Sequence, residues 1–473
     1  MRVIAIKPTL IRHPKIPTAS SRDTFPQGKV NMCSRHLTAP FQSISVCFNI
    51  QNHNFEVIYM STTPNIIPVI IGADLNCYHV ARAFHEEYGV ISEAFGRYET
   101  SATLGSKIIH FHCVPNLDSD EVFLSEMKAF ADAHPNEKKI LIGCTDDYAY
   151  LITRSREVLG DRFIIPYNPL ALMDEFQSKE RFYRCCDKFG IAYPKTVIVP
   201  VGTETAENSY TEESLGFSYP IIVKPSNSGV YWKHPFDGMH KVYVSDSPAR
   251  TKEIIDTIFA SGYDDSIVLQ DMIPGNDSGM YVLTAYCDKH AKVKMITLGH
   301  VLLEEHTPKG RGNHAAIITE YNPALTEPIR KFLEDIGYVG YANFDIKYDP
   351  RDGSYRAFEV NLRQGRSNYY VTAAGENIAR YIVRDYVLDD LGEGCHVCDN
   401  EVLWYSIPRS IIFKYTYNDT LTAKAKTLVR EKKAISSVWY KPDIAGNIKR
   451  LFYVAAAQYR HFEKYRTYCK DYK

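Results

Sequence analysis

The sequence has no uninterrupted apolar run of about 18 residues and no apolar segment typical of a signal peptide. Its 11 cysteines lack the regular spacing of a disulfide framework. It also lacks an excess of either charge, since its formal net charge is -1. These absences argue against a membrane-spanning protein, a disulfide-rich secreted protein and a nucleic-acid-binding protein, so we expect a cytoplasmic enzyme with reduced thiols.

The length of the chain suggests several domains, and its two terminal segments are more basic than the rest. A chain of 473 residues is expected to form about three domains. Residues 1–60 contain 7 Lys or Arg against 2 Asp or Glu, and residues 421–473 contain 13 against 4. Residues 1–62 show no helical or strand period, so we expect 1–63 to be a disordered leader or the result of a mis-assigned start, with Met60 as the alternative start. A transit peptide is the competing explanation of this basic segment.

Strand and helix patterns alternate from residue 64. Residues 65–72 form an apolar run typical of a buried parallel strand, and residues 77–88 have a helical pattern. Further strands are predicted at 107–111 and 139–143, so we expect a Rossmann-like βαβ domain over residues 64–165. No G-x-G-x-x-G follows the first strand, which argues against dinucleotide binding, whereas the polar segment 72–76 suits contacts to a small substrate.

Residues 343–366 contain the most informative pattern of the chain. Apolar and polar residues alternate over 344–349 and again over 358–363, which predicts a β-hairpin with one apolar and one polar face. A five-residue turn over 350–354 is consistent with one register. The pairs predicted by that register are Phe344 with Val360, Ile346 with Phe358, and Asp345 with Glu359.

The polar face of this hairpin suits a hard cation. Asp345, Glu359 and the amide oxygen of Asn361 lie within cross-strand distance in the predicted register, flanked by Lys347 and Arg363. Mg²⁺ prefers oxygen ligands and is usually held by one or two carboxylates together with substrate phosphates. The alternative is a salt-bridged surface hairpin without a metal.

Two lysines are candidates for binding phosphate. Lys179 opens a predicted helix over residues 178–190, where a cation opposes the helix dipole and favours an anionic partner. Lys224 ends an apolar strand, and the small polar loop that follows it offers backbone N–H groups to phosphate oxygens. The loop residues are Ser226, Asn227, Ser228 and Gly229. The alternative for each lysine is a solvated surface position.

Residues 266–277 suit an adenine pocket. A strand, a short polar pair, an apolar step and a Pro-Gly turn follow one another in this segment. Asp277 is the candidate for accepting ribose hydroxyls, and the alternative is an interdomain hinge without a ligand. The residues whose backbone groups are expected to contact the base are Gln270, Asp271, Met272 and Ile273.

These features occur in the order of the ATP-grasp fold, and the chain resembles ATP-grasp carboxylate-amine ligases. Residues 340–353 and 358–367 are similar to the bacterial D-aspartate ligases of peptidoglycan cross-bridge synthesis. The likeness extends through shorter segments and covers roughly residues 64–390. The shorter segments are 67–74, 271–278 and 298–304. The resemblance implies α/β and α+β architecture, with ATP-grasp subdomains over 166–245 and 246–390 and a basic helical extension over 391–473.

The resemblance also implies roles for individual residues. Lys179 and Lys224 match the nucleotide-binding lysines, and residues 270–273 match the adenine hinge. Asp345, Glu359 and Asn361 match the ligands of Mg²⁺, so ATP and two Mg²⁺ ions are implied. Residues 226–229 include one glycine where the family has a glycine-rich loop. The implied catalytic residues, which would face phosphate or the activated carboxylate, are Lys224, Arg363 and Arg366.

By the same resemblance, the donor would be D-aspartate, through its side-chain carboxyl. The acceptor would be the lysine amine of a UDP-linked muramyl pentapeptide, a cell-wall precursor. The basic C-terminal segment would bind this anionic acceptor or associate weakly with an anionic membrane surface, unless it is a solvated face. Two alternatives stay open: an ATP-grasp ligase that forms another amino-acid or dipeptide amide, and a non-catalytic ATP-binding scaffold.

Overall fold

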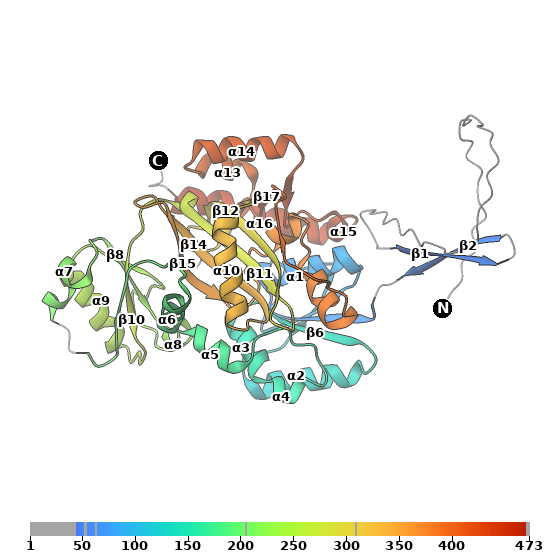
Figure 1. Ribbon diagram of the computed structural model, residues 1–473, viewed down its shortest axis with the longest axis horizontal. Coiled ribbons are helices and arrows are strands. Elements are labelled where there is room, and N and C mark those ends of the chain that lie inside the picture. The colour runs from blue at the N-terminus through green and yellow to red at the C-terminus, as the bar shows by residue number, and fades with distance from the viewer. Residues whose placement is uncertain (1–43, 52–53, 62–63, 204–205, 308–309, 470–473) are drawn as a thin grey trace, which may run out of the picture.

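A computed structural model describes residues 44–51, 54–61, 64–203, 206–307 and 310–469 (Figure 1). Strands β1 (Ile44–Gln51) and β2 (Asn54–Ser61) pair in an antiparallel hairpin that lies apart from the other elements. Our expectation of little structure is therefore wrong for these two strands, which contain many β-branched and aromatic residues. The other residues of 1–63 lie outside the described part of the chain.

The next domain is a parallel sheet in the order β5-β4-β3-β6, which confirms the predicted βαβ domain. Val69 and Ile71 of β3 belong to one buried cluster and Ile70 to another, so both faces of the sheet are covered. The parallel order places the loops after β3 and β6 at the same edge. The elements are β3 (Ile66–Ile71), α1 (Leu75–Tyr88), β4 (Ser92–Gly96), β5 (Ile109–Cys113), α2 (Asp120–Ala133), β6 (Lys138–Gly143), α3 (Asp146–Arg154) and α4 (Arg156–Leu159).

A smaller antiparallel sheet follows, in the order β7-β10-β8-β9. Because β10 lies between β7 and β8, this subdomain continues to residue 271, and the predicted boundary at residue 245 is misplaced. Periodicity identifies a strand but not its neighbours in a sheet. The elements are α5 (Leu170–Gln177), α6 (Lys179–Phe189), β7 (Thr196–Val199), η1 (Glu207–Tyr210), α7 (Glu212–Leu215), β8 (Ile221–Pro225), α8 (Ser228–Tyr231), β9 (Tyr243–Ser245), α9 (Pro248–Ala260) and β10 (Ile267–Asp271).

The largest sheet has the order β15-β14-β11-β12-β13-β17-β18, with β16 beside β12. Leu283 and Phe344 pack with Phe332 of α10 on one face, whereas Val282 packs with Tyr370 of α11 on the other. The elements are η2 (Asp277–Gly279), β11 (Met280–Cys287), β12 (Val293–Glu304), β13 (His314–Glu320), α10 (Pro323–Asp335), β14 (Gly340–Asp349), β15 (Ser354–Asn361), α11 (Tyr369–Ala373), α12 (Ile378–Val383), η3 (Arg384–Leu388) and β16 (His396–Val397).

The C-terminal segment is only partly the helical extension that we predicted. Its strand β17 pairs with β13 and its strand β18 with β17, so it completes the largest sheet. Strands of three residues are too short to show a period in the sequence. Within the described residues, no helix is long and apolar enough to cross a bilayer. The elements are β17 (Leu403–Tyr405), α13 (Arg409–Tyr415), α14 (Asp419–Arg430), β18 (Ala434–Ser436), α15 (Lys441–Ile444) and α16 (Ile448–Tyr468).

The hairpin β14–β15 keeps the predicted register where it matters for the site. The observed pairs include Phe344 with Val360, Asp345 with Glu359, and Ile346 with Ala357. The predicted pair of Ile346 with Phe358 is wrong, because a β-bulge makes Phe358 an extra residue of β15. The turn spans residues 350–353, one residue fewer than predicted. The extra residue and the shorter turn cancel, so the two carboxylates still face each other.

A buried ion pair joins the C-terminal segment to the parallel-sheet domain. Arg450 Nε lies 2.8 Å from Asp443 Oδ2, and the two side chains are 1% and 0% exposed. The groups that complete the hydrogen bonding of this pair come from residues 78–107. They are the Tyr78 hydroxyl, the Ser106 hydroxyl and the Lys107 amide, which donate to Asp443, and the Ser101 and Leu104 carbonyls, which accept from Arg450.

We expect Asp443→Asn to lower the free energy of unfolding by about 3 kcal/mol, because it leaves the Arg450 charge buried without its counter-charge. Urea denaturation followed by near-UV circular dichroism measures the change. Glu253→Gln is the matched control, since it removes an ion pair with Arg250 whose side chains are 63% and 48% exposed. The control should change stability by no more than about 0.5 kcal/mol, and equal losses in both variants would contradict the prediction.

Candidate active site

Two carboxylates face each other where the small sheet meets the largest one. Asp345 of β14 lies opposite Glu359 of β15. Helix α6 packs against β15, and Lys179 in its first turn places Nζ 3.3 Å from Glu359 Oε2. The Lys179 side chain is 12% exposed. Its position beside a carboxylate excludes the alternative of a solvated surface lysine.

The pKa values of the two carboxylates shift in opposite directions. Burial and then repulsion from Glu359 raise the pKa of Asp345 well above its ordinary value. Burial acts in the same direction on Glu359, but the ammonium groups of Lys179, Lys241 and Lys224 together outweigh it, so the pKa of Glu359 is below its ordinary value. A further cation beside Asp345 would relieve the repulsion between the two carboxylates.

Lys224 is a buried cation in a polar cluster. Its Nζ donates to Tyr183 Oη at 3.1 Å and to Gln270 Oε1 at 3.0 Å. Gln270 Nε2 in turn donates to Tyr183 Oη and to Thr196 Oγ1, both at 2.9 Å. Burial lowers the pKa of Lys224 to about 8, although the negative charge of Glu359 acts in the opposite direction. The cluster therefore holds a lysine whose pKa is well below that of an exposed lysine.

Residues 226–229 form a capped helical turn rather than an open loop. Ser226 is fully buried, and its Oγ is 3.0 Å from Ser178 Oγ and accepts from the amide of Glu180 at 3.3 Å. Asn227 Oδ1 accepts from the amide of Val230 at 3.2 Å and caps α8. These side chains stabilise the local structure. A phosphate-binding role stays a prediction for Ser226, Asn227, Ser228 and Gly229.

The predicted adenine hinge already has several contacts within the chain. The carboxylate of Asp271 accepts from two nitrogens of Arg351, at 3.0 and 2.5 Å. The carbonyl of Ile273 accepts from Lys347 Nζ at 2.9 Å. Met272 has a side chain at the surface. The contacts of residues 270–273 with a base therefore stay a prediction.

Asp277 is buried at the beginning of η2. Its Oδ2 accepts from the amide of Glu304 at 2.9 Å and lies 2.7 Å from His306 Nε2. Its contact with ribose stays a prediction, and these neighbours would compete for the same oxygen.

Arg363 connects the hairpin to the parallel-sheet domain. Its Nη2 donates to Asp146 Oδ2 at 2.8 Å and to Asn361 Oδ1 at 3.2 Å. Asn361 Nδ2 donates to Asp345 Oδ2 at 3.3 Å. A continuous polar chain therefore runs from the first residue of α3 to the paired carboxylates.

Arg366, in the segment that follows β15, contacts helix α1 of the same domain. Its Nη1 is 3.0 Å from Glu305 Oε1, and its carbonyl oxygen is 2.9 Å from His79 Nδ1 of α1. Burial raises the pKa of Asp74, while the positive charges of Arg366 and Arg363 lower it. Asp74 lies in the segment 72–76, for which we predicted substrate contacts, so cations and a carboxylate meet at this sheet edge.

Three residues of the site were not found from the sequence. Lys241 precedes β9 without any motif, and the negative charge of Glu359 is the main cause that raises its pKa. Tyr183 of α6 has only an ordinary helical position in the sequence. Asp146 is the first residue of α3 and lies shortly after the end of β6. Because the carboxyl ends of parallel strands meet at one edge of the sheet, this position could have identified Asp146 as a site residue.

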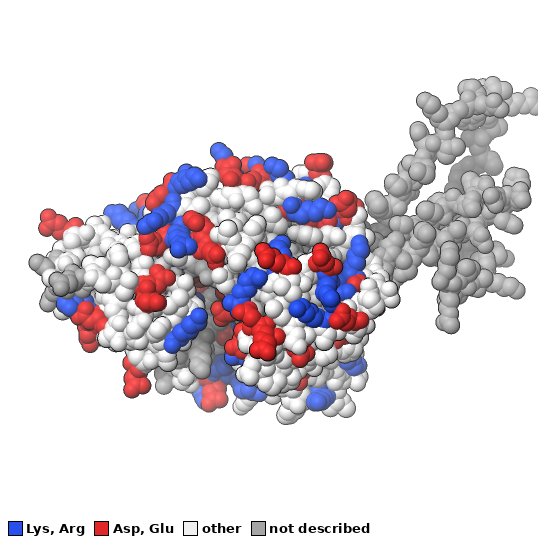
Figure 2. Space-filling model, turned by 90° about the horizontal axis from the view of Figure 1, so that it is seen from below, with Lys and Arg blue, Asp and Glu red and all other residues white. Residues whose placement is uncertain are grey.

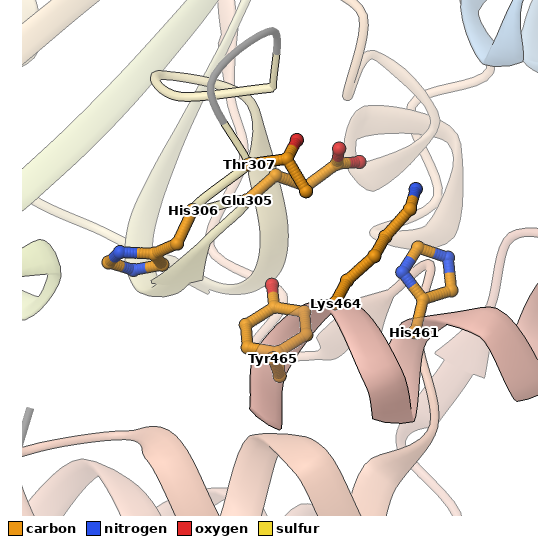
Figure 3. A pocket seen from close by; sticks show the side chains of 6 residues that line it. All are labelled: Glu305, His306, Thr307, His461, Lys464 and Tyr465. Atoms are coloured by element: carbon orange, nitrogen blue, oxygen red, sulfur yellow. The ribbon is translucent and has the colours of Figure 1, made fainter. Parts of the chain in front are cut away.

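A small pocket adjoins Arg366 through Glu305 (Figure 3). One wall is formed by residues 305–307, which come directly after β12 in the sequence, and the other by the C-terminal part of α16. The side chains of Glu305 and Lys464 extend toward the same side, whereas His306 points away from them. The lining residues are Glu305, His306, Thr307, His461, Lys464 and Tyr465.

No protein-family model matches the sequence. A D-aspartate ligase from Enterococcus faecium (strain Aus0004) is 36% identical over 409 residues, which cover 85% of this chain and 96% of that protein. The chain belongs to the D-aspartate ligase family. This membership confirms the resemblance seen in the sequence and makes the chain an ATP-grasp ligase that forms C–N bonds.

Solved structures support the fold of this D-aspartate ligase family member. The biotin carboxylase from Campylobacter jejuni in complex with β-γ-ATP is 13% identical, with a TM-score of 0.52 and coverage of 71% of this chain and 73% of that chain. The biotin carboxylase domain of Hydrogenobacter thermophilus 2-oxoglutarate carboxylase, with MgADP, is 14% identical, with a TM-score of 0.50 and coverage of 67% and 69%. These likenesses show the ATP-grasp fold.

We expect ADP affinity to fall above about pH 8, by up to about tenfold per pH unit, because Lys224 loses its proton there and no longer attracts phosphate. Below that pH the lysine is charged, so its contribution to the affinity should be constant. Isothermal titration calorimetry from about pH 6.5 to pH 9.5 measures the profile. Lys224→Met should remove the pH dependence, whereas the control Lys128→Met, at an exposed position of α2, should keep it. A profile shared by all three proteins would contradict the prediction.

Proposed function

We propose that this enzyme joins the side-chain carboxyl of D-aspartate to the lysine amine of a UDP-linked muramyl pentapeptide and converts ATP to ADP and phosphate. The observation that carries the proposal is the 36% identity to a D-aspartate ligase over 85% of the chain. The acceptor follows from the resemblance of residues 340–353 and 358–367 to ligases of peptidoglycan cross-bridge synthesis.

The proposed reaction has two steps. A carboxylate oxygen of D-aspartate attacks the γ-phosphorus of ATP, and the bond to the ADP oxygen breaks. The lysine amine then attacks the acyl carbon of the resulting acyl phosphate, phosphate leaves, and the amine loses a proton. Lys179, Lys224 and Arg363 offset the negative charge of the phosphates and hold the reactants in place.

Asp345, Glu359 and Asn361 would hold Mg²⁺, and we propose two ions. When bound, Mg²⁺ supplies positive charge to the phosphate oxygens. The residues fit this group in their chemistry, since two facing carboxylates and an amide are oxygen donors, and burial together with the repulsion between the carboxylates raises the pKa of Asp345. The described residues contain no group of three His, Cys, Asp or Glu side chains placed to hold a metal, and phosphate oxygens and water would supply the remaining ligands.

The junction beside Arg366 suits the donor amino acid. The α-carboxylate of an amino acid requires a cation and its ammonium group requires an anion, and Arg363, Arg366 and Asp74 provide both signs within one electrostatic cluster. The surface in Figure 2 has positive and negative side chains interspersed over the face that it shows.

A cytoplasmic location agrees with the use of ATP and of a UDP-linked precursor. The nine cysteines whose side chains the structure describes are free thiols.

A phosphate-release assay tests the proposed substrates. We expect release from ATP only when D-aspartate and the lysine-containing UDP-muramyl pentapeptide are both present, with a product heavier by one aspartyl residue in mass spectrometry. L-aspartate and other amino acids are tested in place of D-aspartate as the donor, and free amino acids are tested in place of the pentapeptide as the acceptor. Turnover that depends on another donor or on a free amine would favour the alternative ligase reaction.

Asp345→Asn should lower kcat by at least about a hundredfold, because it removes a charged ligand of Mg²⁺. ADP binding in EDTA should persist, which separates loss of the metal from loss of the fold. The control is Asp352→Asn, in the turn of the same hairpin, where the carboxylate is 49% exposed. Steady-state rates across a Mg²⁺ titration measure both variants, and an Asp345→Asn enzyme with the activity of the control would exclude the metal site.

A further inference from the structure

Helix α16 buries one face in the protein and presents an apolar stripe on the other. Val454, Gln458 and Tyr465 lie on its buried face, and Arg450 lies in the ion pair with Asp443. The outer stripe repeats at intervals of three and four residues, which places its members along one side of the helix. Its large members are Ile448, Leu451, Phe452, Tyr459 and Phe462, which are 84%, 43%, 67%, 77% and 46% exposed.

Basic side chains flank this stripe. Helix α16 contains five Lys or Arg and a single acidic residue, Glu463. One of the five, Arg450, is neutralised in the buried pair. Lys449, Arg460 and Arg466 are exposed, and the ion pairs found among the described residues do not include them. The outer side of the helix therefore combines apolar surface with uncompensated positive charge.

The apolar surface and positive charge of α16 favour an anionic bilayer over a second copy of the chain as the partner. A second copy of the chain packed helix against helix would bring two positively charged stripes together, which opposes association. An anionic bilayer surface matches both properties, because aromatic and aliphatic side chains enter the boundary of the acyl chains while Lys and Arg pair with lipid phosphates. The 21 residues of α16 extend for about 30 Å, enough to lie along such a surface.

We propose that α16 docks this enzyme reversibly onto a bilayer surface that contains anionic phospholipids. The contact is peripheral, since the inner face of the helix stays packed on the protein. The residues of α16 that line the pocket in Figure 3 belong to this inner side and are separate from the outer stripe. Docking is independent of the acceptor proposed above, so a failure of either proposal leaves the other intact.

Cosedimentation of the full chain with vesicles tests the proposal. We expect binding to vesicles of phosphatidylglycerol and phosphatidylcholine, and at least about tenfold weaker binding to phosphatidylcholine alone or at high salt. A variant with Phe452→Glu, Tyr459→Glu and Phe462→Glu should bind the anionic vesicles at least about tenfold more weakly. Val158→Glu is the control, at an exposed apolar position of α4 in the parallel-sheet domain, and should bind as the wild type does.

Two control measurements separate loss of vesicle binding from unfolding and from a change in oligomeric state. Ligase turnover with soluble substrates should be the same in the triple variant and the wild type, which shows that α16 and the fold are intact. Light scattering should find the same mass for both proteins. Absence of wild-type binding to anionic vesicles would overturn the proposal. A wild-type protein that is dimeric while the triple variant is monomeric would also overturn it, because the stripe would then be an interface between two copies.

Discussion

The charge on Glu359 organises the site. Lys179, Lys224 and Lys241 come from three separate segments, and all three lower the pKa of this one carboxylate. Lys241 and Arg363 also lower the pKa of its facing partner, Asp345, but burial and the repulsion from Glu359 outweigh them, so the ionisation of Asp345 is opposed. The attraction of the three lysines to Glu359 favours the approach of the small sheet to the hairpin at this point. A further cation is needed when phosphates and a substrate carboxylate bind beside Asp345, because all of these groups are negatively charged.

A second constraint is the close approach of the segment after β15 to β14. A Cβ added at Gly365 would lie 2.4 Å from Oδ1 of the buried Asn343, so any other residue at this position would displace that side chain. The turn that the glycine permits brings Arg363 to Asp146 and Arg366 to Glu305. The hairpin, which belongs to the largest sheet, is thereby connected to the edge of the parallel sheet, and the buried pair of Asp443 with Arg450 connects the same domain to the C-terminal segment.

The local features of the site were predictable. Period-2 alternation and a short turn determine which residues of a hairpin face each other, and they identified Asp345 opposite Glu359 even though the bulge at Phe358 was missed. The lysines at a helix start and a strand end were found from the same kind of pattern. The internal contacts of Ser226, by contrast, depend on α6, a segment about fifty residues away in the sequence that no local pattern connects to it.

The sequence by itself determined the longer strands and helices around the site, the paired carboxylates and the family, because these depend on residues close together along the chain or on whole-chain similarity. Only the tertiary structure decided that β10 belongs to the small sheet, that β17 and β18 complete the largest one, and that Lys241 acts on Glu359. It also decided that one side of α16 is exposed among the described residues. Such pairings depend on distances between segments far apart in sequence, which hydrophobic periodicity does not encode.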